Sequence, residues 1–212
     1  MSAPHEALQA AAATSASGRP LCHPGGMAQT PLTDPGALLA TTHELDSGLS
    51  VRLRLTRPSD ERRVREFLER LSPETRERRF LAPMPTVPEA AVRHFTYYDP
   101  RERLIVAATT LIGPSEEILG LADMALLATG LAEIGVLVGD EQQCRGLGRL
   151  LSETVAWLAL QRGATHLKAE MLERNLPMLR LLERIGPTVQ SFEDGRSVAY
   201  TRLPALRARS AA

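Results

Sequence analysis

The sequence predicts a single α/β domain in which a mixed sheet carries helices on its faces. Three observations support this class. The expected order of elements is one strand, two or three helices, three strands, a helix, a strand, a helix and two strands. Hydrophobic residues make up 43% of the 212 residues and charged residues 24%, as in ordinary globular proteins. A chain of this length has room for one domain with a core and tails.

Composition also divides the chain. Residues 1–46 are rich in Ala, Pro, Gly, Ser and Thr, so they bury too little apolar surface to offset the entropy of ordering. We therefore expect a disordered tail over 1–46, a folded domain over 47–205 and a short C-terminal tail over 206–212.

The domain is expected to open with a strand and a helix. "SVRLRLTR" (50–57) alternates apolar residues with arginine, as a half-buried strand does. Ser59 then caps a helix whose apolar residues recur at i, i+3, i+4 and i+7. They are Val64, Phe67, Leu68 and Leu71. Ser72 and Pro73 start a second short helix, and a third covers 88–96.

The remaining elements are predicted from the periodicity of apolar residues and from the turn residues that bound each run. Runs of β-branched and apolar residues bounded by turn residues predict strands at 103–110, 117–126, 132–139 and 165–172. A helix over 147–162 places its leucines on one side and closes at Gly163. Asn175 caps a second helix, which ends at Gly186. "TVQSF" and "SVAYTRL" form a closing hairpin.

The stretch "QCRGLG" (143–148) lies between a strand and a helix and admits three interpretations. A dinucleotide fingerprint needs a third glycine where Leu151 stands, and a phosphate loop of the Walker type needs Lys after Gly148. The third interpretation is a loop whose backbone N–H groups hold a pyrophosphate at a helix N-terminus. Glycine lets that backbone come close, and Arg145 and Arg149 add positive charge.

This stretch resembles the GNAT superfamily of N-acetyltransferases, whose motif Gln/Arg-x-x-Gly-x-Gly/Ala is matched by Gln143, Gly146 and Gly148. Its context is also similar, because a strand precedes it and a helix, a strand and the helix "NLPMLRLLERIG" follow. "LTRPSDERRVREFLERLSPETRERRF", "YYDPRERLIVAAT" and "AEIGVLVGDEQQCRGLGRLL" are similar to the GNAT domain of bacterial Pat-type protein lysine acetyltransferases. The resemblance covers roughly 51–203 and implies a mostly antiparallel GNAT sheet.

The resemblance implies a site for acetyl-CoA as cosubstrate. The expected cofactor-binding residues are Val136, Leu137, Val138, Gln143, Cys144, Arg145, Gly146, Leu147, Gly148, Arg149 and Asn175. The backbone of the first three would follow the pantetheine arm as an added strand. Asn175 has two compatible roles, as a helix cap and as a contact to the cofactor arm. No metal is expected.

Glu133 is the candidate catalytic residue. A lysine amine with a pKa of ~10.4 is almost fully protonated at neutral pH, so a base must take its proton. Glu133 lies just before the loop on the preceding strand, and the matching residue of the Pat pattern "AE" is the family's general base. The alternative is a solvated glutamate on an edge strand.

One departure from the family concerns the leaving thiolate. Many GNAT enzymes carry a tyrosine seven residues after the asparagine as general acid, but this chain has Leu182. Tyr200 is a conceivable substitute, and strand packing is its alternative role. Cys144 would allow an acyl-enzyme, but no histidine is near it in sequence and the family transfers directly in a ternary complex.

The expected function is acetyl transfer to a protein lysine. The alternatives are acetyl transfer to a small amine and a catalytically silent acyl-CoA-binding module. The formal net charge of zero gives no attraction to nucleic acid or membrane, and no apolar run approaches ~20 residues. Two cysteines and no signal-peptide pattern favour a cytoplasmic protein. The resemblance to Pat-type enzymes implies a bacterial one. A monomer and a homodimer are both compatible with the sequence.

Overall fold

A mixed sheet of eight strands organises the computed structural model, which describes residue 39 and residues 42–45, 47–113, 115–173, 175–193 and 196–204. Within these residues the elements in chain order are β1 Thr42–Glu44, β2 Ser50–Leu55, η2 Pro58–Asp60, α3 Glu61–Arg70, α4 Pro73–Phe80, α5 Glu89–Thr96, β3 Arg103–Ile112, β4 Ser115–Ala128, β5 Leu131–Val138, η3 Asp140–Gln142, α6 Leu147–Gln161, β6 His166–Leu172, α7 Leu176–Ile185, β7 Thr188–Glu193 and β8 Arg196–Arg202.

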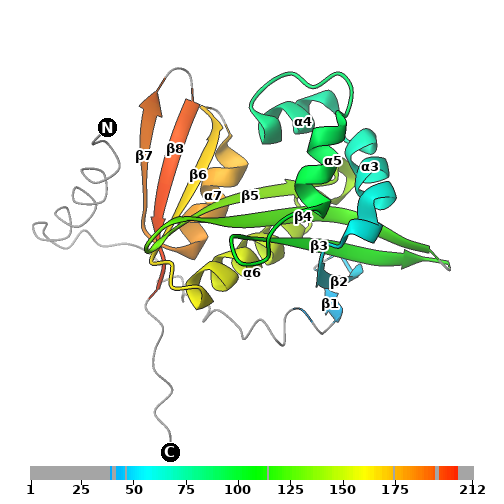
Figure 1. Cartoon of the computed structure of the whole chain (residues 1–212), viewed down its shortest axis with the longest axis horizontal. Helices are drawn as coiled ribbons and strands as arrows, with labels where there is room; N and C mark the ends of the chain where they lie inside the picture. Colours follow the sequence, from blue (N-terminus) through cyan, green and yellow to red (C-terminus); the bar gives the residue numbers. More distant parts are fainter. Residues whose placement is uncertain are drawn as a thin grey trace, which may run out of the picture. The chain divides into compact units, whose positions relative to one another are not determined.

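The strand order is β1-β2-β3-β4-β5-β6-β8-β7. Each neighbouring pair is antiparallel except β5 and β6, which are parallel because α6 connects them as a crossover. Figure 1 shows β6, β8 and β7 turning away from β4 and β5 beyond this junction. The predicted mixed, mostly antiparallel sheet is confirmed.

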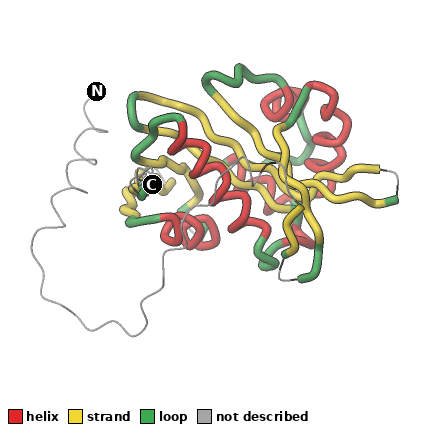
Figure 2. The backbone as a smooth tube through the Cα atoms, turned by 90° about the horizontal axis from the view of Figure 1, so that it is seen from below, coloured by secondary structure: helices red, strands yellow, loops and turns green. Residues whose placement is uncertain are grey.

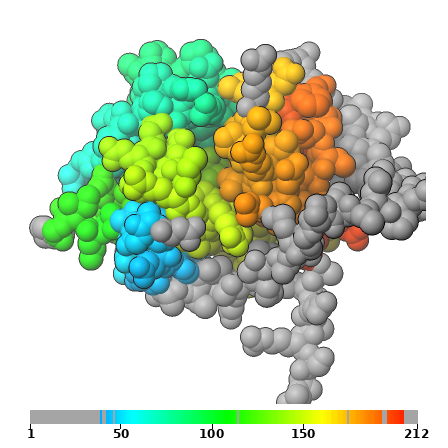
Figure 3. Space-filling model, turned by 180° about the vertical axis from the view of Figure 1, so that it is seen from behind, coloured from blue at the N-terminus to red at the C-terminus, as the bar shows by residue number. Residues whose placement is uncertain are grey.

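Helices cover the sheet on both faces, as the tube in Figure 2 shows. On one face, Val64, Phe67 and Leu68 of α3 pack with Phe95 of α5 against the central strands. On the other face, α6 and α7 enclose a larger core with their leucines. Figure 3 shows the yellow-green residues of α6 beside the orange residues of the C-terminal elements. Burying each such side chain stabilises the fold by about 1.5–3 kcal/mol.

Strand β1 corrects the predicted extent of the N-terminal tail. Residues Thr42–Glu44 pair antiparallel with β2, although they lie inside the segment 1–46 that composition marks as disordered. The paired backbone and the nearly buried Leu45 supply order that a weakly apolar composition does not reveal. The rest of the predicted tail and residues 206–212 lie outside the described residues, apart from Leu39.

The predicted cap at Ser59 is wrong. Residues Pro58–Asp60 form the 3-10 turn η2, and α3 starts at Glu61 with Asp60 in the N-cap position. Asp60 is 2% exposed, and its carboxylate accepts two hydrogen bonds from Arg54 at 2.7 and 2.8 Å. The partly buried Arg54 requires such a partner, and this ion pair moves the helix start by one residue.

The other predicted caps are confirmed. The Ser72 side chain accepts from the Thr75 N–H at 3.2 Å, and the Asn175 side chain accepts from the Met178 N–H at 3.3 Å. Strand β7 begins two residues after Gly186, where a proline follows the helix. A Cβ at Gly186 would lie 2.1 Å from the Arg202 carbonyl oxygen, so glycine is what allows α7 to end against β8.

Candidate active site

The site forms where β5 and β6 stop pairing. Their parallel register holds for three residue pairs and ends with Glu133 opposite Lys168. From Ile134 to Val138, β5 remains paired with β4 on its other side. No described strand pairs with the edge of β5 that faces β6 over this stretch, so its N–H and C=O groups can bind an extended ligand.

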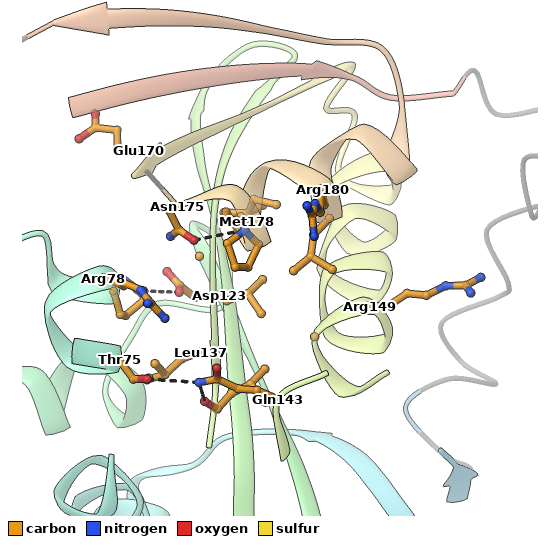
Figure 4. Close-up of a pocket in the computed structure, with 18 of the residues that line it drawn as sticks. Thr75, Arg78, Asp123, Leu137, Gln143, Arg149, Glu170, Asn175, Met178 and Arg180 are labelled. Carbon is orange, nitrogen blue, oxygen red and sulfur yellow. Dashed lines mark hydrogen bonds and ion pairs between the residues drawn. The ribbon is translucent and has the colours of Figure 1, made fainter. Parts of the chain in front are cut away.

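A cavity of about 640 Å³ occupies this opening. Its walls come from β5, the loop before α6, the N-terminal part of α7, and residues of α4 and α5. Figure 4 shows Gln143, Asn175 and Asp123 entering it from three different elements. Such a concave site with convergent polar groups is the usual form of a small-molecule site.

The loop 143–148 has the backbone geometry of an anion-binding turn. Cys144 and Gly146 have φ values of 59° and 88°, and α6 starts at Leu147 with no side-chain cap. Residues of left-handed conformation next to a helix start turn successive N–H groups to one side. A Cβ at Gly148 would make only ordinary contacts, 3.5 Å from Leu181 and 3.6 Å from Val138, so the structure itself leaves room there.

Gln143 and Asp140 attach this loop to α4. The Gln143 Nε2 donates to Thr75 Oγ1 at 3.2 Å and to the Val138 carbonyl at 3.4 Å. Asp140 accepts from Thr75 Oγ1 at 2.6 Å and from both the N–H and Oγ of Ser72 at 2.8 Å. Burial alone would raise the pKa of Asp140, but these hydrogen bonds outweigh it and lower that pKa below its usual value.

The predicted cofactor residues fall into two groups. Val136, Leu137, Val138, Gln143, Cys144, Gly146, Gly148, Arg149 and Asn175 line the cavity. Arg145 is exposed and lies outside the lining, and Leu147 is fully buried, so only its backbone faces the turn. The Arg149 side chain bonds Glu153 at 2.8 Å and points away from the other lining residues in Figure 4.

Two arginines that the sequence did not single out line the cavity from α7. Arg180 and Arg184 are one helical turn apart and exposed, and among the described residues no carboxylate lies within 4.0 Å of either guanidinium. Leu181, between them, approaches the loop at Gly148. These two side chains therefore place positive charge beside the anion-binding turn. The i, i+4 spacing of the two arginines can be read from the sequence, but the contact between α7 and the loop 143–148 cannot.

Glu133 lines the cavity from β5, between β4 and β6, and so is not on an edge strand. Its side chain is 38% exposed, and its Oε1 lies 3.7 Å from the Lys168 Nζ. The carboxylate can therefore exchange protons with groups in the cavity.

A buried ion pair lies beside Glu133 on the same sheet face. Asp123 of β4 is 8% exposed and accepts from Arg79 Nη2 at 2.5 Å, while His94 Nε2 is 3.6 Å away. The Arg79 guanidinium lies over the rings of Phe80 and Phe95. Burial opposes ionisation of Asp123, but Arg79 and His94 outweigh it and lower its pKa to about 2.

Gly135 makes room for this pair, because a Cβ there would lie 2.8 Å from both Arg79 Nη2 and Asp123 Oδ1. A glycine inside an apolar strand is the sequence signal of such a close approach. His94, which the sequence gave no special role, also lines the cavity and contacts Arg103 at 2.8 Å.

Neither position discussed for protonation of the thiolate lies in the cavity lining. Leu182 is fully buried in the core on α7. Tyr200 is half-buried on β8, in register with Lys168, and is not part of the cavity lining.

The described residues were also compared with the requirements of a metal site and of a membrane span, and they meet neither. They hold no group of three or more His, Cys, Asp or Glu side chains placed to bind a metal. No helix in this part of the chain is both long and apolar enough to cross a bilayer.

Comparison with known proteins places this geometry in a family. Residues 64–186 match the acetyltransferase (GNAT) family. The GNAT domain of S. lividans PAT is 29% identical, with a TM-score of 0.68 over 77% of this chain and 96% of that one.

More distant structures share the fold. A cAMP-binding acyltransferase from Mycobacterium smegmatis is 22% identical (TM-score 0.54, 78% of this chain, 48% of that one). A GNAT acetyltransferase from Streptococcus pneumoniae is 18% identical (TM-score 0.56, 73% and 99%). With the family match spanning more than half of its length, this chain belongs to the GNAT family of N-acetyltransferases.

Proposed function

We propose that this N-acetyltransferase transfers acetyl from acetyl-CoA to a protein lysine by direct attack in a ternary complex. The observation that carries the proposal is Glu133, which lines the cavity at the point where β5 and β6 part. The resemblance to Pat-type lysine acetyltransferases along most of the domain supports lysine as the acceptor.

The residues of the cavity fit acetyl-CoA. The N–H groups of 144–148 suit its pyrophosphate, and Arg180 and Arg184 add positive charge there. The unpaired edge of β5 from Ile134 to Val138 suits the amides of the pantetheine arm. Bound in this way, acetyl-CoA supplies the thioester, and a backbone N–H of β5 would polarise its carbonyl.

Glu133 would take the proton of the acceptor amine. At neutral pH only a few lysine side chains in ten thousand are uncharged, given a pKa of ~10.4. A carboxylate within hydrogen-bond reach, directly or through one water, raises the fraction that can attack. Cys144 is exposed on the anion-binding turn, so we assign it to the cofactor site and not to an acyl-enzyme.

One observation favours a small amine that carries a carboxylate as the second candidate acceptor. Arg103 is half-buried in the cavity, and among the described side chains its hydrogen-bond partner is the ring of His94. A carboxylate on the acceptor could accept paired hydrogen bonds from the Arg103 guanidinium.

Incubation of the protein with radiolabelled acetyl-CoA and a cell lysate separates the candidates. Label on proteins is expected. Label confined to small molecules would move the acceptor to the second candidate. With no label anywhere, the protein would be a silent acyl-CoA-binding module.

Acetyl-CoA should stabilise the protein without added metal or nucleotide, because it binds the folded site and not the unfolded chain. At a hundredfold excess over Kd the gain in unfolding free energy should be about 2.7 kcal/mol. Thermal unfolding at rising acetyl-CoA concentration measures this. An unchanged melting temperature at millimolar ligand would contradict the proposed cofactor site.

Gly148→Ala should separate binding from folding. The added methyl has room in the structure, and alanine favours a helix over glycine by up to about 1 kcal/mol. The same methyl would keep a pyrophosphate from the N–H groups, so the affinity for acetyl-CoA should fall by roughly 10- to 100-fold, the equivalent of one or two lost charged hydrogen bonds.

For Gly148→Ala, calorimetric titration measures the affinity for acetyl-CoA, and denaturant unfolding of the same sample measures the stability. Gly148→Val should lose more affinity for acetyl-CoA, because its side chain is larger. Unchanged affinity in both variants would mean that the loop is only a turn.

A further inference from the structure

Lys168 is the only lysine among the 25 lysines and arginines of the chain. It lies on β6 in the last register pair before β5 and β6 separate, directly opposite Glu133. Its Nζ is 2.5 Å from Glu170 Oε1 and 3.7 Å from Glu133 Oε1, and both glutamates line the cavity. The side chain is 20% exposed.

The Lys168 nitrogen lies where the proposed mechanism requires the attacking amine of an acceptor. Under the proposed mechanism, the attacking nitrogen must come within reach of the Glu133 carboxylate. The Lys168 nitrogen already lies beside that carboxylate, on the sheet face that bears Asp123 and Gly135. Its flexible four-carbon stem allows the nitrogen to move into the opening.

Charge pairing alone does not call for lysine here. Arginine forms two-pronged hydrogen bonds with carboxylates and serves every other cationic position of this chain. What lysine adds is a primary amine, which loses its proton more easily and can be acylated.

We propose that the enzyme acetylates its own Lys168. The inference rests on the proposed function. The Lys168 nitrogen forms a bond to the acetyl carbon while the bond from that carbon to the CoA sulfur breaks. Two of the three ammonium protons leave the nitrogen, one to Glu133 and one to the CoA thiolate, and the third stays on the amide nitrogen. The products are therefore acetyl-Lys168, CoA as its thiol and one proton, which Glu133 releases to solvent.

The modification would change the electrostatics of the site. Burial lowers the pKa of Lys168, but hydrogen bonding to Glu170 and the charges of Glu170 and Glu133 outweigh it, so the pKa is raised and the amine is held as an ammonium. Acetylation removes the positive charge and leaves Glu133 and Glu170 without their shared cation.

Intact-mass spectrometry of the full chain with acetyl-CoA tests this inference. The expected result is the mass of one acetyl group on the wild type and none on Lys168→Arg, with loss of tryptic cleavage after residue 168. The rate should be independent of protein concentration, because donor and acceptor share one molecule. Glu133→Gln should slow it by at least tenfold, and excess CoA, which competes for the donor site, should suppress it.

Labelling of lysate proteins is measured in the same tube, so that the two hypotheses fail separately. If lysate proteins are labelled and Lys168 stays unmodified, self-acetylation is wrong and the proposed function stands. If Lys168 is modified equally with excess CoA present, the reaction is not enzymatic and the inference is also wrong. If neither is labelled while acetyl-CoA stabilises the protein, both proposals fail.

Discussion

Glu133→Gln is expected to lower turnover at neutral pH by about 10²–10⁴-fold, the usual cost of losing a general base. Glutamine keeps the size of the side chain but cannot accept a proton. The affinity for acetyl-CoA should change little, because the anion-binding turn and the backbone edge of β5 are untouched. Steady-state kinetics and calorimetry on the same variant test both parts.

The pH profile identifies the reason for the loss. As pH rises toward the pKa of the acceptor amine, free amine forms without help, so the Glu133→Gln variant should recover relative to the wild type. Glu170→Gln is the matched control, since it removes one negative charge from the same cavity and the same lysine. A deficit that is equal at every pH, or equal in the two variants, would remove Glu133 from proton transfer.

Asp123→Asn should lower the unfolding free energy by about 3–5 kcal/mol, as expected when one partner of a buried pair is removed. The change leaves the Arg79 guanidinium without its carboxylate at a site where Asp123 is only 8% exposed. Denaturant unfolding measures the loss. Glu74→Gln on α4, the helix that carries Arg79, is the control. Glu74 pairs with Arg78 on the surface, so its loss should cost at most about 1 kcal/mol.

The contribution of Asp123 should also depend on pH. Its folded pKa of about 2 lies below the unfolded value of ~3.9, so the stabilisation is complete above about pH 4. It is lost as pH falls toward 2, where the folded state must also take up the proton. The stability difference between wild type and Asp123→Asn should therefore shrink over this range, and a constant difference would assign the cost to packing instead of charge.

Local pattern was enough to predict most elements of the fold. The periodic stripe from Val64 to Leu71 and the caps at Ser72 and Asn175 depend on neighbours in sequence, and they were predicted correctly. The start of α3 depends on Arg54, whose carboxylate partners come from another strand and turn. Strand β1 depends on the edge of β2, so neither feature could be read from a short window.

The sequence predicted the parts of the site that lie close together in the chain, but not the contacts between elements that are distant in sequence. Glu133 and the loop 143–148 stand next to each other in sequence, and the family motif locates them. Arg79 comes from α4 and Asp123 from β4, which are far apart in sequence. The register of β4 with β5 places Asp123 opposite Gly135, where the missing side chain leaves room for the pair. Because Arg79 neutralises Asp123, this carboxylate offers no unpaired negative charge to a cationic acceptor.

The hydrogen bonds that join Gln143 and Asp140 to the start of α4 are expected to couple the binding of the two substrates. The loop serves the donor, while α4 brings Arg78 and Arg79 to the rest of the cavity. A ligand that orders one of these segments lowers the entropic cost of ordering the other. By reciprocity, whatever factor acetyl-CoA adds to the affinity for the acceptor, the acceptor adds to the affinity for acetyl-CoA.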